Sequence, residues 1–366
     1  MVKYIKVFGA ALDPSDSGTK VLIKRAHLDA LATGREEKSK YFDPYDAFIT
    51  ESKILQRPNF KKIGKFPIES WLRPKPDLED HIFMTPLDFR IFLDSNGCKE
   101  YADAMEKFIE QKVFPDIPLM IGADHSLTGG VLKALSKKYG AENIAVIILD
   151  GHFDAIPTFL RLELAKYSQE HKNEVQIPFP ELIDSIDETT KIPLSYNCGT
   201  FLYHLMEQKV VDAQHLIVFG TMDYPSDEIK AIQDPRVKQY VDFYLSYQKK
   251  GITIIPNYKD NERMKTEFKE ALEKLNTPYL YLSIDVDVSS LKAVLAARFM
   301  EFFGVDEEGL KNAADLIRKL VQSKKIEIIG LDLMEIEVYY LNAILKSGKS
   351  DKTIAVMDNF LESILF

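Results

Sequence analysis

The amino-acid sequence predicts an α/β protein with three layers, α/β/α, around a mostly parallel central sheet. Short apolar runs rich in Val, Ile and Leu recur at 4–12, 117–123, 143–150, 215–221, 251–256, 279–288 and 326–333. Each run is too short for a typical helix and too uniformly apolar for a half-exposed strand, which indicates strands buried on both faces. Apolar residues at helical spacing occur between or after them, at 127–140, 262–276, 306–323 and 353–366. This alternation of strands and helices predicts helices on both faces of the sheet.

We expect residues 1–366 to form a single domain, because no composition shift or repeat divides the chain. Residues 13–116 are less regular, with many Pro and aromatic residues, and we expect loops and helices packed on the same sheet. The polar stretch 155–196 lies between two predicted core strands. We interpret it as an insertion near the active face.

Composition excludes several classes of protein. The two cysteines suggest no disulfide framework and favour a cytoplasmic location. No apolar run approaches the length of a membrane helix. The net charge of −9 is spread over interspersed acids and bases, so we expect neither a nucleic-acid nor a membrane partner.

Acids and histidines follow four of the predicted strands. Asp124 and His125 come after one strand, and Asp332 and Glu335 end another. The other two strands are followed by Asp150, His152, Asp154 and by Asp285, Asp287. Ligands of open α/β sheets gather at the carboxyl ends of the strands. Residues i, i+2 and i+4 of an extended chain point to the same side, so Asp150, His152 and Asp154 are expected to converge on one point. The same holds for Asp285 and Asp287.

Such a cluster needs cations. Four carboxylates at one point repel and raise one another's pKa, whereas two divalent cations would cancel four negative charges. Carboxylates with two imidazoles suit Mn²⁺ better than a thiolate-type zinc site does. Two metals can share a bridging water and convert it to hydroxide near neutral pH, which makes it a nucleophile.

Simpler interpretations apply to single residues. A lone Asp at a strand end is usually a helix cap or turn residue, and we interpret Asp332 that way when it is taken alone. A lone His beside an acid is more often structural. Three Asp/His clusters on three strand ends are harder to explain by structure alone, so their conjunction favours a metal site.

At this point the chain resembles the ureohydrolase superfamily of arginase, agmatinase and their relatives. The signatures Gly-Gly-Asp-His-Ser, Asp-Ala-His-x-Asp and Ser-x-Asp-x-Asp correspond in order to "GADHS" (122–126), "DGHFD" (150–154) and "SIDVD" (283–287), and "GLDLME" (330–335) resembles a fourth element. The resemblance implies two Mn²⁺ per chain, held by His125, Asp150, His152, Asp154, Asp285 and Asp287. In it, Asp150 and Asp285 bridge both metals, Asp154 also carries a proton to the leaving nitrogen, and Glu335 anchors a cationic guanidine or amidine group.

The sequence departs from that pattern around the substrate. Ser290 and Leu291 stand where the family has Asp-Pro, and the stretch 288–304 looks helical and bulky. Cys198 stands where the family often has His. A small apolar wall of the substrate pocket, a proton relay and a nucleophile are its three candidate roles, of which we favour the wall.

The resemblance therefore implies a hydrolase of a C–N bond in a small guanidino or amidine compound other than arginine, and it allows a homo-oligomer. Two alternatives stay open. One is an amide hydrolase resembling the deacetylase branch, which uses one metal. The other is a non-catalytic protein that kept the fold. A metal count of two, one or none separates these three hypotheses.

Overall fold

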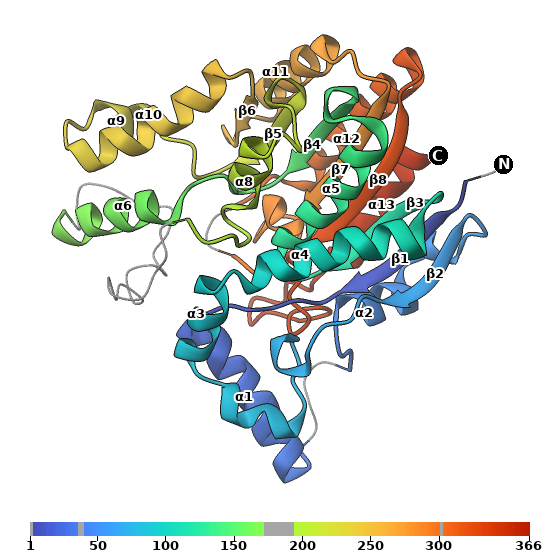
Figure 1. Cartoon of the computed structure of the whole chain (residues 1–366), viewed down its shortest axis with the longest axis vertical. Helices are drawn as coiled ribbons and strands as arrows, with labels where there is room; N and C mark the ends of the chain where they lie inside the picture. The colour runs from blue at the N-terminus through green and yellow to red at the C-terminus, as the bar shows by residue number, and fades with distance from the viewer. Residues whose placement is uncertain (1–2, 36–39, 172–193, 301–302) are drawn as a thin grey trace.

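The computed structural model describes residues 3–35, 40–171, 194–300 and 303–366. Its centre is an eight-stranded sheet in the order β2-β1-β3-β8-β7-β4-β5-β6, and every paired neighbour is parallel (Figure 1). The strands are β1 (Ile5–Ala10), β2 (Phe60–Lys65), β3 (Ile117–Gly122), β4 (Ile144–Leu149), β5 (Leu216–Thr221), β6 (Thr253–Pro256), β7 (Tyr279–Asp285) and β8 (Glu327–Met334). The predicted parallel sheet is confirmed.

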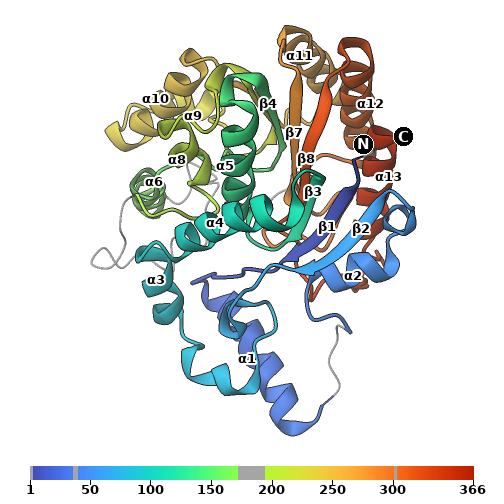
Figure 2. The same cartoon turned by 45° about the vertical axis from the view of Figure 1, so that its right-hand side comes forward.

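Helices cover both faces of this sheet. They are α1 (Gly18–Thr33), α2 (Pro44–Glu51), α3 (Pro86–Asp94), α4 (Gly97–Phe108), α5 (Thr128–Tyr139), α6 (Thr158–Glu170), α8 (Phe201–Glu207), α9 (Asp227–Ala231), α10 (Pro235–Lys249), α11 (Asn261–Lys274), α12 (Glu307–Lys324) and α13 (Thr353–Leu365). Figure 2 shows α4 and α5 on one side of the sheet and α12 and α13 on the other. The four helices expected from apolar spacing correspond to α5, α11, α12 and α13.

Two hydrophobic cores explain the three layers. Alternate strand residues point to opposite faces, so Ile147 of β4 belongs to the core that includes residues of α2, α11, α12 and α13, whereas Ile148 belongs to the core that includes residues of α1, α4, α5, α8 and α10. Because both faces are buried, the strands needed apolar residues at nearly every position. The three-layer α/β/α architecture predicted from those runs is confirmed.

The sequence did not reveal β2. Its pattern "FKKIGK" is mostly polar, because β2 is the edge strand and only Phe60 is buried. Edge strands commonly carry Lys, which discourages pairing with other chains. The rest of the described part of the region 13–116, residues 13–35 and 40–116, forms helices and loops against the sheet, as expected.

The polar stretch 155–196 is described only at its two ends. Residues 158–170 form α6, which packs against α10, and residues 172–193 lie outside the described part of the chain. Thr158, Arg161 and Ser195, from the described ends of this stretch, line the same cavity as Asp154 and Glu335. The interpretation of this stretch as an insertion stays a prediction.

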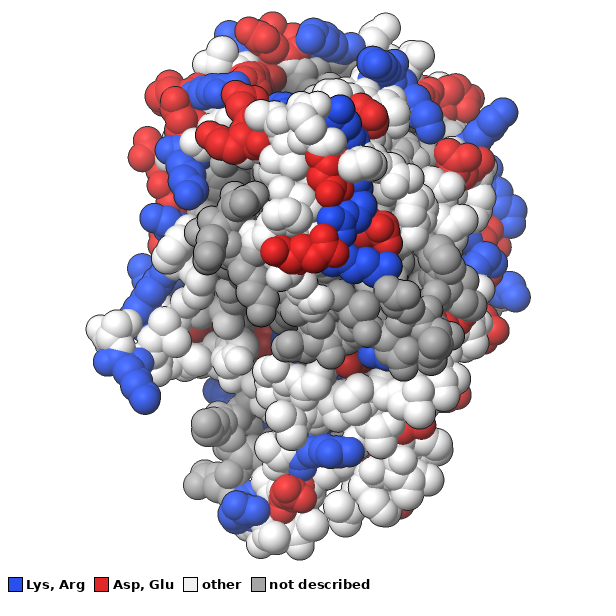
Figure 3. Space-filling model, turned by 90° about the vertical axis from the view of Figure 1, so that its left-hand side faces the viewer, with Lys and Arg blue, Asp and Glu red and all other residues white. Residues whose placement is uncertain are grey.

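None of the described helices is long and apolar enough to cross a membrane. Figure 3 shows basic and acidic side chains interspersed over the face that includes α6 and α10, without a broad basic patch among the coloured residues.

Candidate metal centre

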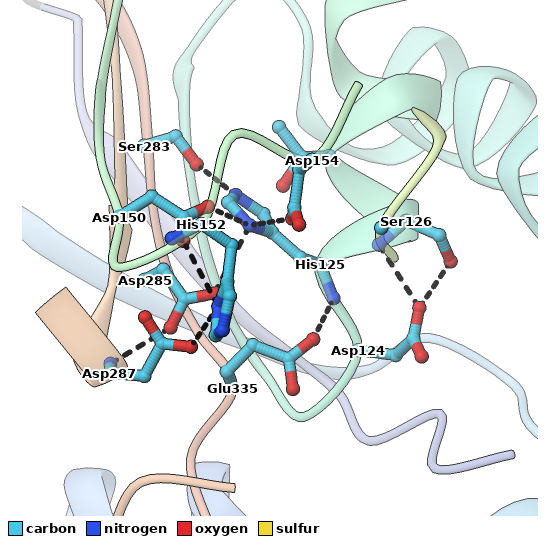
Figure 4. Close-up of polar contacts among 12 residues, drawn as sticks. Asp124, His125, Ser126, Asp150, His152, Asp154, Ser283, Asp285, Asp287 and Glu335 are labelled. Atoms are coloured by element: carbon cyan, nitrogen blue, oxygen red, sulfur yellow. Dashed lines mark hydrogen bonds and ion pairs between the residues drawn. The ribbon is translucent and has the colours of Figure 1, made fainter. Parts of the chain in front are cut away.

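Four neighbouring strands of the sheet, β3, β8, β7 and β4, carry the candidate site at their carboxyl ends. His125 follows β3, Asp150 follows β4, and Asp285 ends β7. The His125 Nδ1 atom lies 3.2 Å from an oxygen of Asp150, 3.1 Å from one of Asp154 and 3.3 Å from one of Asp285. These four buried residues form the first group of possible metal ligands (Figure 4).

A second group lies beside the first. His152 Nδ1 is 3.0 Å from an oxygen of Asp287 and 3.8 Å from one of Asp150. Asp287 belongs to the single turn Val286–Ser289 that follows β7. Asp150 is a member of both groups, whereas Asp285 is grouped with His125. The structure thus brings together all six residues that the sequence singled out as ligands.

Backbone amides hold the carboxylates in place. The N–H of His152 donates to Asp150 Oδ1 at 2.6 Å, that of Gly151 to Asp287 Oδ1 at 2.9 Å, and that of Asp287 to Asp285 Oδ1 at 2.9 Å. In Asp150 and Asp287 the other oxygen is buried, makes no hydrogen bond and faces an imidazole Nδ1, that of His125 at 3.2 Å and that of His152 at 3.0 Å. Oxygen and imidazole ligands that face one another in this way suit divalent cations. The residues present therefore fit a two-metal centre.

Crowding of the charges shifts the pKa values in the metal-free chain. Burial, then the neighbouring carboxylates, raises the pKa of both Asp150 and Asp285 well above the ordinary value. Burial opposes a charge on His125, but Asp150, Asp154 and Asp285 outweigh it and raise the imidazole pKa. Burial likewise disfavours charge on Asp287, yet His152 lowers the pKa of this carboxyl. Protons on the carboxyls and on the imidazoles therefore offset part of the negative charge of the cluster, and bound divalent cations would displace these protons.

A hydrogen-bonded chain behind His125 orients its ring. His125 Nε2 contacts Ser283 Oγ at 2.7 Å, and Ser283 donates to Asp332 Oδ1 at 2.6 Å. Thr128 and Tyr281 donate to the other oxygen of Asp332. With Nε2 engaged, Nδ1 is directed at the carboxylates, which is how metal-binding histidines are usually fixed.

Asp332 was therefore misinterpreted from the sequence as a cap or turn residue. It lies inside β8, fully buried, and is paired in register with Ser283 of β7. An acid in the middle of an apolar strand was the available signal, since such a residue needs dedicated partners.

Extended-chain alternation does not explain how Asp150, His152 and Asp154 converge. β4 ends at Leu149, and Asp154 has φ +49°, in the left-handed region. Glu335, directly after β8, also has a positive φ of 57°. Non-glycine residues seldom adopt this conformation, and strained backbone of this kind is enriched at functional sites. The chain thus turns sharply at both positions to aim these carboxylates inward.

A cavity of about 180 Å³ opens onto the ligands. Its wall includes His152, Asp154, Asp285 and Asp287 on the metal side and Cys198, Arg298 and Glu335 opposite or beside them. This volume suits a small molecule, and the polar groups converge as they do in ligand sites.

The Sγ atom of Cys198 lies within 4.8 Å of a carboxylate oxygen of Asp124 and of one of Glu335. Burial, then these two carboxylates, raises the pKa of its thiol well above the ordinary value. A protonated thiol is a poor nucleophile, so this environment favours the wall among the three candidate roles.

Arg298 is the residue of the site that sequence reasoning missed. Its guanidinium Nη1 lies 3.0 Å from Asp124 Oδ2 and 3.2 Å from Glu335 Oε2, and its Nε lies 2.8 Å from Asp13 Oδ1. The second oxygen of Glu335 accepts from the N–H of His125 at 2.8 Å. A single Arg within the apolar stretch "AVLAARFM" was the only sequence signal of such a buried pair.

The expectation of a helical stretch at 288–304 is wrong for the residues described there. After Ser289 the chain makes turns and isolated bridges instead, and Leu291 has φ +59°. The Arg298 backbone N–H bonds Glu335 O at 2.7 Å, so this loop is held against the end of β8. Apolar residues at helical spacing were needed here to fill the core beside the site.

The fold and the site together define an α/β protein with a candidate metal centre at the carboxyl edge of its sheet. Within that class, the chain belongs to the arginase family, whose model matches residues 50–364. No curated protein matches the chain in sequence.

Solved structures share the fold at low identity. Formimidoylglutamase from Bacillus subtilis matches with a TM-score of 0.55 and 16% identity, covering 100% of this chain and 86% of that one. Proclavaminate amidino hydrolase from Streptomyces clavuligerus matches with a TM-score of 0.54 and 15% identity, covering 99% of this chain and 91% of that one. Arginase from Bacillus caldovelox matches with a TM-score of 0.54 and 16% identity, covering 99% of this chain and 98% of that one. Identities this low support the fold and leave the substrate to be argued from the site.

Proposed function

We propose that this chain is a metal-dependent hydrolase that cleaves a C–N bond in a guanidino or related amidine compound, with two Mn²⁺ per chain. One observation carries the proposal. Six possible ligands from three strand ends gather in two adjoining groups, in which carboxylate oxygens and imidazole Nδ1 atoms face one another at 3.0 to 3.3 Å. Membership of the arginase family supports the reaction class.

When bound, two such cations lower the pKa of a shared water and supply a nucleophile near neutral pH. Asp154 belongs to the first ligand group and also lines the cavity. It is therefore the carboxylate placed to accept a proton from the nucleophile and pass it to the leaving nitrogen. The neighbouring backbone turn with positive φ keeps it in that position.

Glu335 and Cys198 form the part of the cavity wall where a substrate would be recognised. Glu335 is fully buried, and burial, only partly offset by Arg298, raises its pKa to about 8. Cys198 contributes a small uncharged surface beside it. The substrate therefore meets a buried acid and a thiol next to the metal ligands.

An amide hydrolase is a second candidate, and Arg298 is the observation that favours it. A carboxylate that already holds a guanidinium has less to offer a cationic amidine than a free one does. An amide, whose reacting carbon carries a carbonyl oxygen in place of a cationic nitrogen, would not compete with Arg298 for Glu335. Both candidates draw on the same cluster of ligands, but an amide hydrolase that resembles the deacetylase branch would hold one metal there rather than two.

A substrate screen tests the proposal. Protein reconstituted with Mn²⁺ is incubated with guanidino, formimino and amide compounds, and the release of urea, formamide or amine is measured. We expect turnover with at least one C–N compound, abolished by a chelator and restored by Mn²⁺. Metal-loaded protein that hydrolyses no member of any of the three classes would contradict the proposal.

A further inference from the structure

Arg298 holds a fixed position in the wall of the cavity. Its side chain is buried, and it contacts carboxylates that follow three different strands: Asp13 after β1, Asp124 after β3 and Glu335 after β8. It also donates to the carbonyl of Ala123 at 3.3 Å. Contacts from three strand ends leave the guanidinium little freedom to swing away.

The charges explain why this arrangement is stable. A buried arginine is tolerated only when it is paired and hydrogen-bonded. Lys24, buried as well, lies 3.3 Å from Asp13 and shares in neutralising the acids. The buried carboxylates of Asp13, Asp124 and Glu335 therefore have two cations supplied by the chain itself.

This pairing occupies the acidic part of the cavity. Asp124 and Glu335 line the same cavity as the metal ligands. A carboxylate oxygen of Asp124 lies within 4.8 Å of a carboxylate oxygen of Glu335, and Cys198 Sγ lies within the same distance of both. Two such carboxylates would bind the planar N–H groups of a guanidinium or amidinium ion. Here the guanidinium of Arg298 already makes those contacts, so an incoming cation must compete with it.

Arg298 leaves one group for a ligand. The hydrogen bonds of its side chain to described residues all run through Nη1, and its ion pairs are closest through Nε and Nη1, so Nη2 makes no hydrogen bond with the described residues. Arg298 lines the cavity, so Nη2 offers N–H donors at this end of it. Because these N–H groups can only donate hydrogen bonds, they favour a ligand that carries an oxygen acceptor.

We propose that Arg298 is a specificity-determining residue, which excludes guanidinium and amidinium cations from Glu335 and selects a substrate whose oxygen acceptor lies at this end of the cavity. The inference rests on the proposed function and narrows its substrate class. Two sources of that oxygen share the chemistry: the carbonyl of an amide, or the carboxylate of an amidine that carries one.

Binding of small probes tests the inference in the wild type without relying on turnover. Calorimetry with Mn²⁺-loaded protein measures methylguanidine, acetamide and acetate. We expect methylguanidine to bind more weakly than about 10 mM, and Glu335→Gln to leave that binding unchanged. Acetamide binding would identify the carbonyl as the source, and acetate binding the carboxylate. Tight methylguanidine binding that Glu335→Gln removes would overturn the inference, as would the failure of both oxygen probes to bind.

Substitution of Arg298 makes the test sharper. Arg298→Met should raise the affinity for methylguanidine at least tenfold and lower that for the bound oxygen probe at least tenfold. Arg90→Met is the matched control, because Arg90 lines the same cavity but pairs with Asp16, and it should not raise methylguanidine affinity. Equal effects of both substitutions would contradict a specific role for Arg298.

A folding defect has its own control. If Arg298→Met does not fold, Arg298→Met with Glu335→Gln removes both charges of the pair, and this double variant should lack the methylguanidine site. Methylguanidine binding by the double variant as tight as that expected of Arg298→Met would overturn the role of Glu335. A chain that binds no Mn²⁺ would refute the proposed function alone, since the contacts of Arg298 involve no metal ligand side chain.

Discussion

The two walls of one cavity differ in how closely they follow a family pattern. On the metal side, all six expected ligands gather at the ends of β3, β4 and β7, as the order of the sequence signatures predicts. On the substrate side, Cys198 stands where the family often has His, and Arg298 pairs with Glu335. Ser290 and Leu291 also depart from the family pattern, but they are not among the residues that line the cavity. Under the proposed function, the ligand groups would be constrained by the charges of two metals, whereas the other wall would be constrained only by the substrate. The difference is what the proposal expects of an enzyme that keeps its reaction and changes its substrate.

The largest expected effect concerns the metal wall. Asp285→Asn should reduce Mn²⁺ binding and lower turnover about 10³-fold or more, because the nucleophile depends on the metals. Its carboxyl pKa is raised by burial and by neighbouring acids, so the metal-free variant should melt at a higher temperature than the metal-free wild type. Metal analysis and thermal unfolding check both effects.

Asp223→Asn is the control for that substitution. Asp223 is also a buried acid just after a strand, β5, but it belongs to neither ligand group. It should keep the Mn²⁺ content of the wild type. Equal metal loss in both variants would mean that the cluster is no more special than any buried acid, and the comparison of the two walls would fail.

The support behind the metal wall is the next test. Asp332→Asn keeps the shape of the side chain but weakens the chain through Ser283 to His125. We expect a loss of about 10- to 100-fold in metal affinity or activity, the usual size for such supporting residues. Excess Mn²⁺ should restore most of the activity, while unchanged affinity at every Mn²⁺ concentration would leave Asp332 with a packing role only.

The pH dependence of unfolding tests the charge crowding. The folded-state pKa is raised for Asp150, Asp285 and His125, and to about 8 for Glu335. A group with a raised folded pKa contributes stability below its unfolded pKa, and this contribution is lost as pH rises through the folded value. The metal-free chain should therefore lose several degrees of melting temperature between about pH 5.5 and about pH 8.

Mn²⁺ should reverse that trend, because metals bind the deprotonated ligands. The rise in melting temperature on adding Mn²⁺ should be larger at the higher pH. A rise that is equal at both pH values would show that the metals do not replace protons in the cluster.

The smallest effect is expected on the substrate wall. Cys198→Ala should change the rate within about tenfold, or roughly 1.4 kcal/mol of barrier, because a thiol with a raised pKa serves as a wall. Steady-state kinetics on the substrate found by screening measure it. A loss of a thousandfold or more with metals still bound would give the thiol a direct chemical role.

Much of the fold and the metal wall could be predicted because both depend on local patterns. Strands buried on two faces are apolar throughout, and parallel strands bring their carboxyl ends to one edge. Edge strand β2 was missed because it needs little apolar surface. The role of Asp332 was misinterpreted and Arg298 was missed, because their partners lie far away in the sequence: Ser283 in one case and Asp13 and Asp124 in the other.

The central claim is that the cluster is built for two divalent cations, and metal content tests it most directly. Purified protein is incubated with excess Mn²⁺, freed of unbound metal and analysed for Mn²⁺ per chain. Two ions per chain are expected, with Asp150→Asn retaining fewer because Asp150 belongs to both ligand groups. One ion per chain would contradict the two-metal centre, and none would contradict the hydrolase.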